Sequence, residues 1–320
     1  MKKVLGIFLA VALLVQMTAC NTMFPFSLLM KDRVESNSSS SAVESEESEA
    51  VSPDSMAPEK ETSSQVEQPD FNELTLIDND ECAIVLTGIE PDNTMGYTLQ
   101  LRLENKSKDK NYMFSVLDAT VNGLKSDPYF ASEVAAGKKA NEELWFDSEE
   151  LAAIGLVDFT DIQLFFNVYD SDDWAADAVA EETVHIYPNG EASATTYTRK
   201  DTSSDVVLVD NDYVKVVAID AGFDDIWGYQ LNLFFVNKTD TTVMFATEDE
   251  ALNGYMADPY FAMTVPAGCS AFDSVDWGLT TLEENAITDV ETIELTLIAY
   301  DDEDYSADYF ANTAVSLTVE

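Results

Sequence analysis

The chain has 320 residues, of which 46% are hydrophobic, and its 61 acidic and 16 basic residues give a formal net charge of -45. This composition is that of a folded protein, and the length suffices for two ordinary domains with tails. The charge excludes nucleic acid as a partner, because phosphate binding needs clustered basic residues and residues 204–320 hold only Lys215 and Lys238. It favours a soluble, self-repelling surface, with binding of cations or of a basic partner as the alternative.

The N-terminus has the layout of a bacterial export signal. Lys2 and Lys3 precede an apolar run that ends in Met17-Thr-Ala-Cys20. This segment resembles the lipobox of bacterial lipoproteins, with Met17 in place of the usual leucine. The resemblance implies that residues 1–19 are a signal peptide and that Cys20 becomes the lipidated first residue.

A second interpretation of the N-terminus stays open. No charged residue occurs between Lys3 and Lys31, so this span is long enough to cross a bilayer as an uncleaved signal anchor. Pro25 and several polar residues weigh against that alternative. In both cases we expect the remainder at the extracellular face of the cell membrane.

A polar segment follows the anchor. Residues 34–70 are crowded with Ser, Glu and Pro, contain Lys60 as their one basic residue, and lack apolar periodicity. That composition is typical of disorder. We therefore expect residues 20–70 to form a disordered linker that lifts the folded part off the membrane.

The rest of the chain consists of two similar copies. The motif Asp78-Asn-Asp80 recurs as Asp210-Asn-Asp212, and further motifs follow in the same order in each copy: Gly-Tyr, Asn-Lys-Ser/Thr, Val/Leu-Asn-Gly, Asp-Pro-Tyr-Phe and Ala-Gly. Each copy is long enough to close its own core, unlike a solenoid unit. The sequence predicts repeat 1 over 71–190, a linker over 191–203 and repeat 2 over 204–320.

Apolar residues alternate with polar ones in each copy. Tyr97, Leu99, Leu101 and Leu103 form such a row, which predicts a strand with one buried face. Other strands are expected over 74–77, 82–89, 112–121, 140–146, 161–169 and 183–187, with a short helix at 148–154 that recurs around Leu282. About seven strands per copy predict an all-β fold of two tandem immunoglobulin-like β-sandwich domains.

In their order, the repeated motifs resemble those of immunoglobulin-like domains of unknown function that are common in Gram-positive surface lipoproteins. The resemblance covers residues 74–187 and 206–319. It implies a cell-surface location, and it assigns no catalytic or ligand-binding residues.

An acidic loop in each copy is the strongest candidate for chemistry. It holds Asp170, Asp172, Asp173 and Asp177 in repeat 1, and Asp301, Asp302, Glu303, Asp304 and Asp308 in repeat 2. Calcium prefers such oxygen ligands. The spacing lacks the glycine and terminal glutamate of an EF-hand loop, so a solvated loop is the alternative. No other cofactor is expected.

Two further motifs have both a structural and a functional interpretation. The Asn-Gly pairs at 122–123 and 253–254 predict tight type I′ hairpins. The aromatic residues of the Asp-Pro-Tyr-Phe motif either fill the edge of a core or form an exposed platform for a sugar or peptide; they are Tyr129, Phe130, Tyr260 and Phe261.

No residue set makes a convincing active site, and we expect no enzymatic activity. The single histidine, His185, has Ser316 as its counterpart and lies between apolar neighbours of the opposite strand face. Cys82 and Cys269 occupy different positions in the two copies. That favours two separate thiols, with an inter-domain disulfide as the alternative.

Together these patterns predict a membrane-anchored extracellular binding or interaction lipoprotein. Its duplicated domains would present loops to a protein, cell-wall or glycan partner that the sequence does not identify. One alternative is a structural envelope spacer without a dedicated ligand. Another is a calcium-binding surface module.

Overall fold

The computed structural model describes residues 72–319, with position 129 excepted. The expected signal peptide, the lipidation site Cys20, the alternative signal anchor and the linker 20–70 lie outside the described residues. Among the described residues, no helix is long and apolar enough to cross a membrane.

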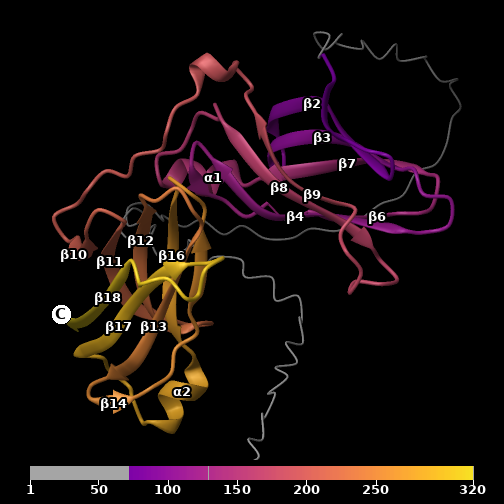
Figure 1. Cartoon of the computed structure of the whole chain (residues 1–320). Helices are drawn as coiled ribbons and strands as arrows, with labels where there is room; N and C mark the ends of the chain where they lie inside the picture. The colour runs from indigo at the N-terminus through magenta and orange to yellow at the C-terminus, as the bar shows by residue number, and fades with distance from the viewer. Residues whose placement is uncertain (1–71, 129, 320) are drawn as a thin grey trace, which may run out of the picture. The chain divides into compact units, whose positions relative to one another are not determined.

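Repeat 1 contains two antiparallel sheets (Figure 1). The first has the order β1-β2-β3-β7 and consists of β1 (Leu74–Asp78), β2 (Cys82–Asn93), β3 (Gly96–Asn105) and β7 (Lys139–Phe146). In the second, β4 pairs with β5, β6 and β8, and β8 pairs with β9. Its strands are β4 (Tyr112–Val121), β5 (Leu124–Lys125), β6 (Ala131–Val134), β8 (Ile162–Asp170) and β9 (Ala180–Ile186), and α1 (Ser148–Ala153) lies between β7 and β8 in the chain.

Repeat 2 has the same arrangement. Its first sheet has the order β10-β11-β12-β16 and consists of β10 (Val206–Asp210), β11 (Val214–Asp224), β12 (Gly228–Asn237) and β16 (Ser270–Trp277). Its second sheet consists of β13 (Val243–Leu252), β14 (Tyr255–Met256), β15 (Ala262–Val265), β17 (Thr292–Asp301) and β18 (Ala311–Thr318), and α2 (Leu279–Glu284) lies between β16 and β17 in the chain. A 3-10 turn at Glu191–Ser193 lies between the repeats.

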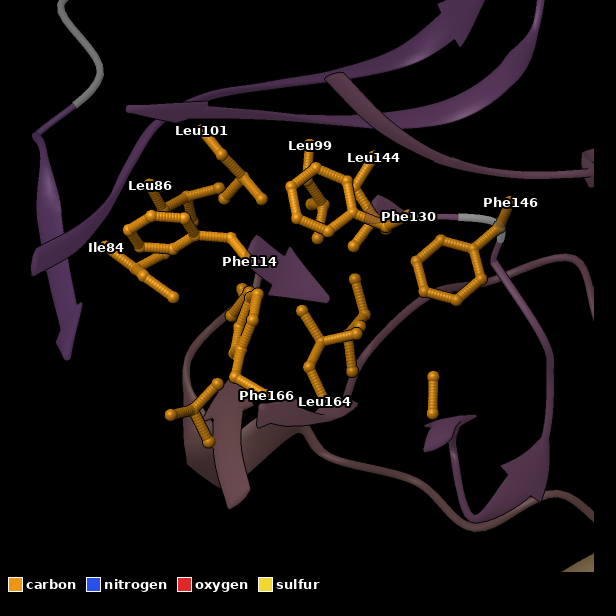
Figure 2. Close-up of a cluster of buried hydrophobic side chains, with 14 of the residues drawn as sticks. Ile84, Leu86, Leu99, Leu101, Phe114, Phe130, Leu144, Phe146, Leu164 and Phe166 are labelled. Carbon is orange, nitrogen blue, oxygen red and sulfur yellow. The ribbon is translucent and has the colours of Figure 1, made fainter. Parts of the chain in front are cut away.

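The buried rows of alternating side chains form the cores. Figure 2 shows Leu99 and Leu101 of the first sheet facing Phe114, Leu164 and Phe166 of the second. Burying each such side chain contributes roughly 1.5–3 kcal/mol. The predicted all-β class and the sandwich architecture are therefore confirmed, with β4 at its predicted bounds.

Some strands differ from the expectation. β2 continues to Asn93, beyond the predicted end at 89, because the β2–β3 hairpin keeps its backbone pairing through a polar stretch that shows no alternation. β9 begins at Ala180 rather than 183. The short strands β5 and β6 were not predicted, since two to four residues are too few to show a period.

Asparagines of the repeated motifs satisfy backbone groups at equivalent turns. The buried Asn105 donates two hydrogen bonds of 2.8 Å, to the carbonyls of Lys110 and Val134. Asn237 makes the equivalent bonds to Thr241, at 2.8 Å, and to Val265, at 2.9 Å. Because buried backbone carbonyls need partners, this motif has a structural role.

The Asn-Gly pairs form the expected tight hairpins. Asn122 and Asn253 both have a φ of 53°, and their glycines have a φ of 74° and 78°. Positive φ at both central residues is the signature of a type I′ turn. Asn122 also donates a hydrogen bond of 2.6 Å to the carbonyl of Asp158, and Asn253 one of 2.7 Å to that of Asp289.

All described residues belong to one compact unit, and the connection between the repeats is packed rather than merely polar. The Tyr197 hydroxyl donates a hydrogen bond of 2.8 Å to the carbonyl of Ile154 in repeat 1. Its ring lies 6.5 Å from that of Phe234 and 6.4 Å from that of Phe272, both in repeat 2. A single parallel bridge between Ser270 of β16 and Leu124 of β5 also joins the two repeats, so that the second sheet of repeat 1 and the first sheet of repeat 2 form one continuous nine-stranded sheet.

Side chains of repeat 2 extend the hydrophobic cluster of repeat 1. Val217 and Phe234 belong to that cluster, and Ile219, Val236 and Phe272 pack against it. The remaining core of repeat 2 forms a second cluster. The prediction of a linker between separate domains missed this contact between the repeats. The five apolar residues lie on three strands and form one patch only after folding.

Candidate binding loops

The candidate site is the acidic loop between β8 and β9, with its counterpart between β17 and β18. Each loop begins with a carboxylate that caps a turn. Asp170 accepts a hydrogen bond of 3.1 Å from the N–H of Asp172, and Asp301 accepts bonds of 2.9 and 3.3 Å from the N–H groups of Glu303 and Asp304. These are Asx turns, in which the carboxylate sets the loop conformation.

A neighbouring loop lies against each acidic loop in the same way. The N–H of Ser171 donates to the carbonyl of Asn111 at 3.0 Å, and the N–H of Asp302 donates to that of Thr242 at 3.1 Å. The loop 106–111 of repeat 1 and the loop 238–242 of repeat 2 are therefore the nearest source of side chains that can neutralise the carboxylates.

Only repeat 1 has a cation in contact with this first carboxylate. Lys110 Nζ lies 3.1 Å from Asp170 Oδ2. The Lys110 ammonium and the N–H of Asp172 hold the pKa of Asp170 below its usual range. In repeat 2 the position of Lys110 is taken by Thr241, as the matching carbonyl bonds to Asn105 and Asn237 show.

The calcium prediction gains no support from the arrangement of these carboxylates. Within the described ranges, no group of three or more His, Cys, Asp or Glu side chains could hold a metal ion. Asp304 instead accepts hydrogen bonds from the hydroxyl and the N–H of Ser306, at 2.6 and 3.0 Å, and these bonds lower its pKa. Calcium binding stays a prediction.

The structure reveals exposed aromatic residues in both loops that the sequence analysis overlooked. Trp174 is 83% exposed and Tyr305 is 73% exposed. Each stands four residues after the carboxylate that caps its loop. The spacing is visible in the sequence, but the exposure of the two rings is a property of the folded chain.

In repeat 2 the exposed aromatics form a cluster on the outward side of the sheet. The ring of Tyr300, near the end of β17, lies 5.8 Å from those of Tyr305 and Tyr309. Tyr300 pairs with Met244 of β13, as Tyr169 pairs with Met113 in repeat 1. We call Tyr300, Tyr305 and Tyr309 the tyrosine cluster.

The aromatics that the sequence singled out are divided between core and surface. Phe130 is buried among the core side chains, as Figure 2 shows, so it is not part of an exposed platform. Phe261 packs against the core of repeat 2, with its ring 5.6 Å from that of Phe235. Tyr260 is exposed, and Tyr129 lies outside the described residues.

The remaining candidate residues do not converge on these loops. Cys82 and Cys269 are both free and buried, and burial raises the pKa of each thiol to about 11. His185 lies on strand β9 with its Nδ1 2.8 Å from Asp161 Oδ1, and its ring stacks on that of Tyr187 at 5.6 Å. These pairs lie at the start of β8 and the end of β9, opposite the loop that connects the two strands.

Comparisons with known proteins identify no activity. No known family model matches the chain, and a comparison with curated proteins finds no match. One similar solved structure is the crystal structure of a protein of unknown function from Porphyromonas gingivalis, with 11% sequence identity and a TM-score of 0.21, covering 78% of this chain and 99% of that chain.

Proposed function

We propose that this protein is a membrane-anchored extracellular lipoprotein whose two repeats bind a partner through the β8–β9 and β17–β18 loops. The observation that carries the proposal is the presence of an exposed aromatic side chain, Trp174 or Tyr305, at the same loop position in both repeats. The N-terminal sequence that ends in Cys20 supports the extracellular location.

The exposure of these rings favours binding over a spacer role. A large aromatic side chain gains free energy when it leaves water, and Trp and Tyr are enriched among the residues that dominate binding energy at interfaces. The repeated Asn-Lys-Ser/Thr motif, by contrast, serves the fold, because Asn105 and Asn237 satisfy buried backbone carbonyls. A spacer would need the scaffold but not an aromatic residue at the tip of each acidic loop.

Site-specific photocrosslinking tests the binding role in cells that naturally produce the full chain. A photoreactive phenylalanine analogue replaces Trp174 or Tyr305, and in matched controls it replaces Val157 or Leu279. Both control residues are exposed, at 68% and 46%, and they precede β8 and β17, at the opposite end of each sandwich. We expect a discrete adduct from the loop positions and none from the controls.

Equal crosslinking at both ends would contradict the proposal and favour the spacer alternative. Loss of the adduct when the other repeat's aromatic residue is replaced by alanine would show that both loops bind the same partner. Adduct formation that persists after both aromatic residues are replaced would mean that the rings do not contribute.

The lipid anchor has a separate test. Mass spectrometry of the purified full-length product is expected to find a peptide that starts at Cys20 and carries a diacylglyceryl group, and Cys20→Ser is expected to block processing. Recovery of residues 1–19 in the mature wild-type protein would instead identify an uncleaved signal anchor and contradict lipidation.

A further inference from the structure

We propose that the tyrosine cluster of repeat 2 binds a Lys or Arg side chain of a partner polypeptide. This inference rests on the proposed binding function and names its partner class. The loop of repeat 2 is the more aromatic of the two loops, with Tyr305 73% and Tyr309 49% exposed around the partly buried Tyr300.

The ring geometry suits a cation. The Tyr300 ring lies 5.8 Å from each of its two neighbours, at interplanar angles of 51° and 34°. A cation is attracted to an aromatic face from within roughly 6 Å of the ring centroid. A guanidinium or ammonium seated over Tyr300 therefore meets more than one ring at once, and Arg can also stack on a ring plane.

The charge around the rings favours the same occupant. The loop contributes acidic side chains on both sides of Tyr305 and no basic ones; they are Asp302, Glu303, Asp304 and Asp308. The neighbouring loop adds Asp240, and its one basic residue, Lys238, is paired with Asp210 at 2.7 Å. A cationic segment is steered to such a surface and held there by charge, whereas a neutral sugar could donate hydrogen bonds to the carboxylates but would gain no attraction from their net charge.

In repeat 1, the carboxylate that caps the acidic loop is paired with a lysine of the same chain. Lys110 Nζ lies 3.1 Å from Asp170 Oδ2, at the base of the β8–β9 loop. The equivalent pair in repeat 2 is Thr241 and Asp301. Among the described residues, no Lys or Arg is paired with Asp301, so repeat 2 leaves the charge of this carboxylate available to the cation of a partner.

The probe is a fluorescently labelled tetra-arginine peptide, and binding to the full chain is followed by anisotropy at 150 mM salt. Wild type is compared with Tyr305→Ala/Tyr309→Ala, which leaves the net charge unchanged. We expect binding to weaken about 5- to 10-fold, which is the loss for one or two cation–π contacts. Tyr305→Phe/Tyr309→Phe keeps the rings and is expected to stay within about 2-fold of wild type.

Two matched controls separate the cluster from general attraction to an acidic chain. Tyr255→Ala removes a tyrosine of repeat 2 that is 58% exposed outside the loop, and it is expected to leave binding within about 2-fold. The substitution Thr241→Lys introduces the cation that Lys110 provides in repeat 1, whereas Ser316→Lys adds the same charge on β18. Only Thr241→Lys is expected to weaken binding about 3-fold or more beyond the shared effect of charge.

Equal peptide binding by wild type and Tyr305→Ala/Tyr309→Ala would overturn the inference while leaving the crosslinking result, and thus the proposed function, untouched. A chito-oligosaccharide whose binding is lost in that variant, with peptide binding unchanged, would identify a glycan site instead. If the peptide result is as expected but no crosslinks form in cells, the site chemistry stands and the proposed function fails.

Discussion

The first sheets of the two repeats share their strand pairing but not their outward surfaces. Arg102 of β3 pairs with Asn141 of β7 in repeat 1, and Phe234 of β12 pairs with Phe272 of β16 at the equivalent place in repeat 2. Arg102 is bound to Glu73 at 2.7 Å in repeat 1. In repeat 2 the apolar pair is packed against the hydrophobic cluster of repeat 1.

This difference shows which positions a duplicated sandwich can change. Inward side chains fill a close-packed core and tolerate little change in volume. Outward side chains are constrained only by what covers them, so one copy has a charged surface and the other an apolar one. The side chains that the two repeats share therefore belong to the common scaffold. Those that differ reflect what each repeat contacts.

The largest effect is expected where the repeats are the same. A side chain at Gly96 or Gly228 would overlap the carbonyl oxygen of Phe146 or Trp277, and the two glycines have a φ of 114° and 92°. We expect Gly96→Ala and Gly228→Ala each to lower the free energy of unfolding by at least about 3 kcal/mol, measured by denaturant unfolding of the full chain. Gly222→Ala, where a Cβ meets open space, serves as the control, and an equal loss there would refute the steric explanation.

The next effect concerns the outward faces themselves. The double substitution Phe234→Ala/Phe272→Ala is expected to cost about 2–5 kcal/mol, because it removes buried aromatic contacts. At the equivalent positions of repeat 1, where Arg102 is half-buried and Asn141 is exposed, Arg102→Ala/Asn141→Ala is expected to cost less than about 1 kcal/mol. Both free energies of unfolding are measured by the same denaturant experiment. Similar decreases in the two double variants would contradict the proposed difference between the two outward surfaces.

A smaller, pH-dependent effect is expected at Asp273, the counterpart of Glu142. Burial, together with nearby acidic groups, raises the pKa of Asp273 from 3.8 to about 7. The folded state therefore holds a proton that the unfolded state has lost between about pH 4 and 7, so this contribution to stability falls as the pH rises through that window. Above pH 7 the folded state bears the buried charge.

We expect Asp273→Asn to raise the melting temperature of the full chain at pH 8 by about 2–4 °C, the shift that 1 kcal/mol gives in a chain of this size. At pH 5 we expect a smaller rise, because only part of the stability that is lost between pH 4 and 7 has been lost at that pH. Scanning calorimetry at both pH values measures the difference. A shift of the same size at pH 5 would show that the side chain acts through packing rather than through its charge.

The smallest expected effect is that of calcium on the acidic loops. The carboxylates of Asp170, Asp301 and Asp304 already accept hydrogen bonds within their own loops, so these groups are not held in place as free ligands. We expect millimolar calcium to shift the melting temperature of the full chain by less than about 1 °C, since an ion that does not bind the folded state cannot stabilise it. A larger rise that chelation reverses, and that Asp301→Asn abolishes, would establish a calcium site.

The fold was largely predictable because strand alternation is a local signal. The row from Tyr97 to Leu103 fixes a strand with one buried face, and the Asn-Gly pairs fix two hairpins through the φ angles that they allow. The short strands β5 and β6 were not predictable, since they depend on pairing with β4. The contact between the repeats depends on residues that are far apart in the sequence.

The candidate site was predictable only as a loop. The sequence located its acidic residues, but it could not show which aromatic residues are exposed. Phe130 and Tyr305 both follow an acidic residue closely, yet the first is in the core and the second is in solvent. That distinction depends on how each side chain packs in the folded protein, and no local pattern encodes it.

The two buried cysteines allow the opening of each repeat to be followed by thiol modification. Cys82 starts β2 in repeat 1 and Cys269 directly precedes β16 in repeat 2. With thiol pKa values of about 11, only about one molecule in ten thousand holds the reactive thiolate at neutral pH, so oxidants and alkylating reagents act on these thiols very slowly in the native state. A modifying reagent therefore reports transient opening of the structure. Peptide mapping of the modified positions would show which half of the molecule opens first.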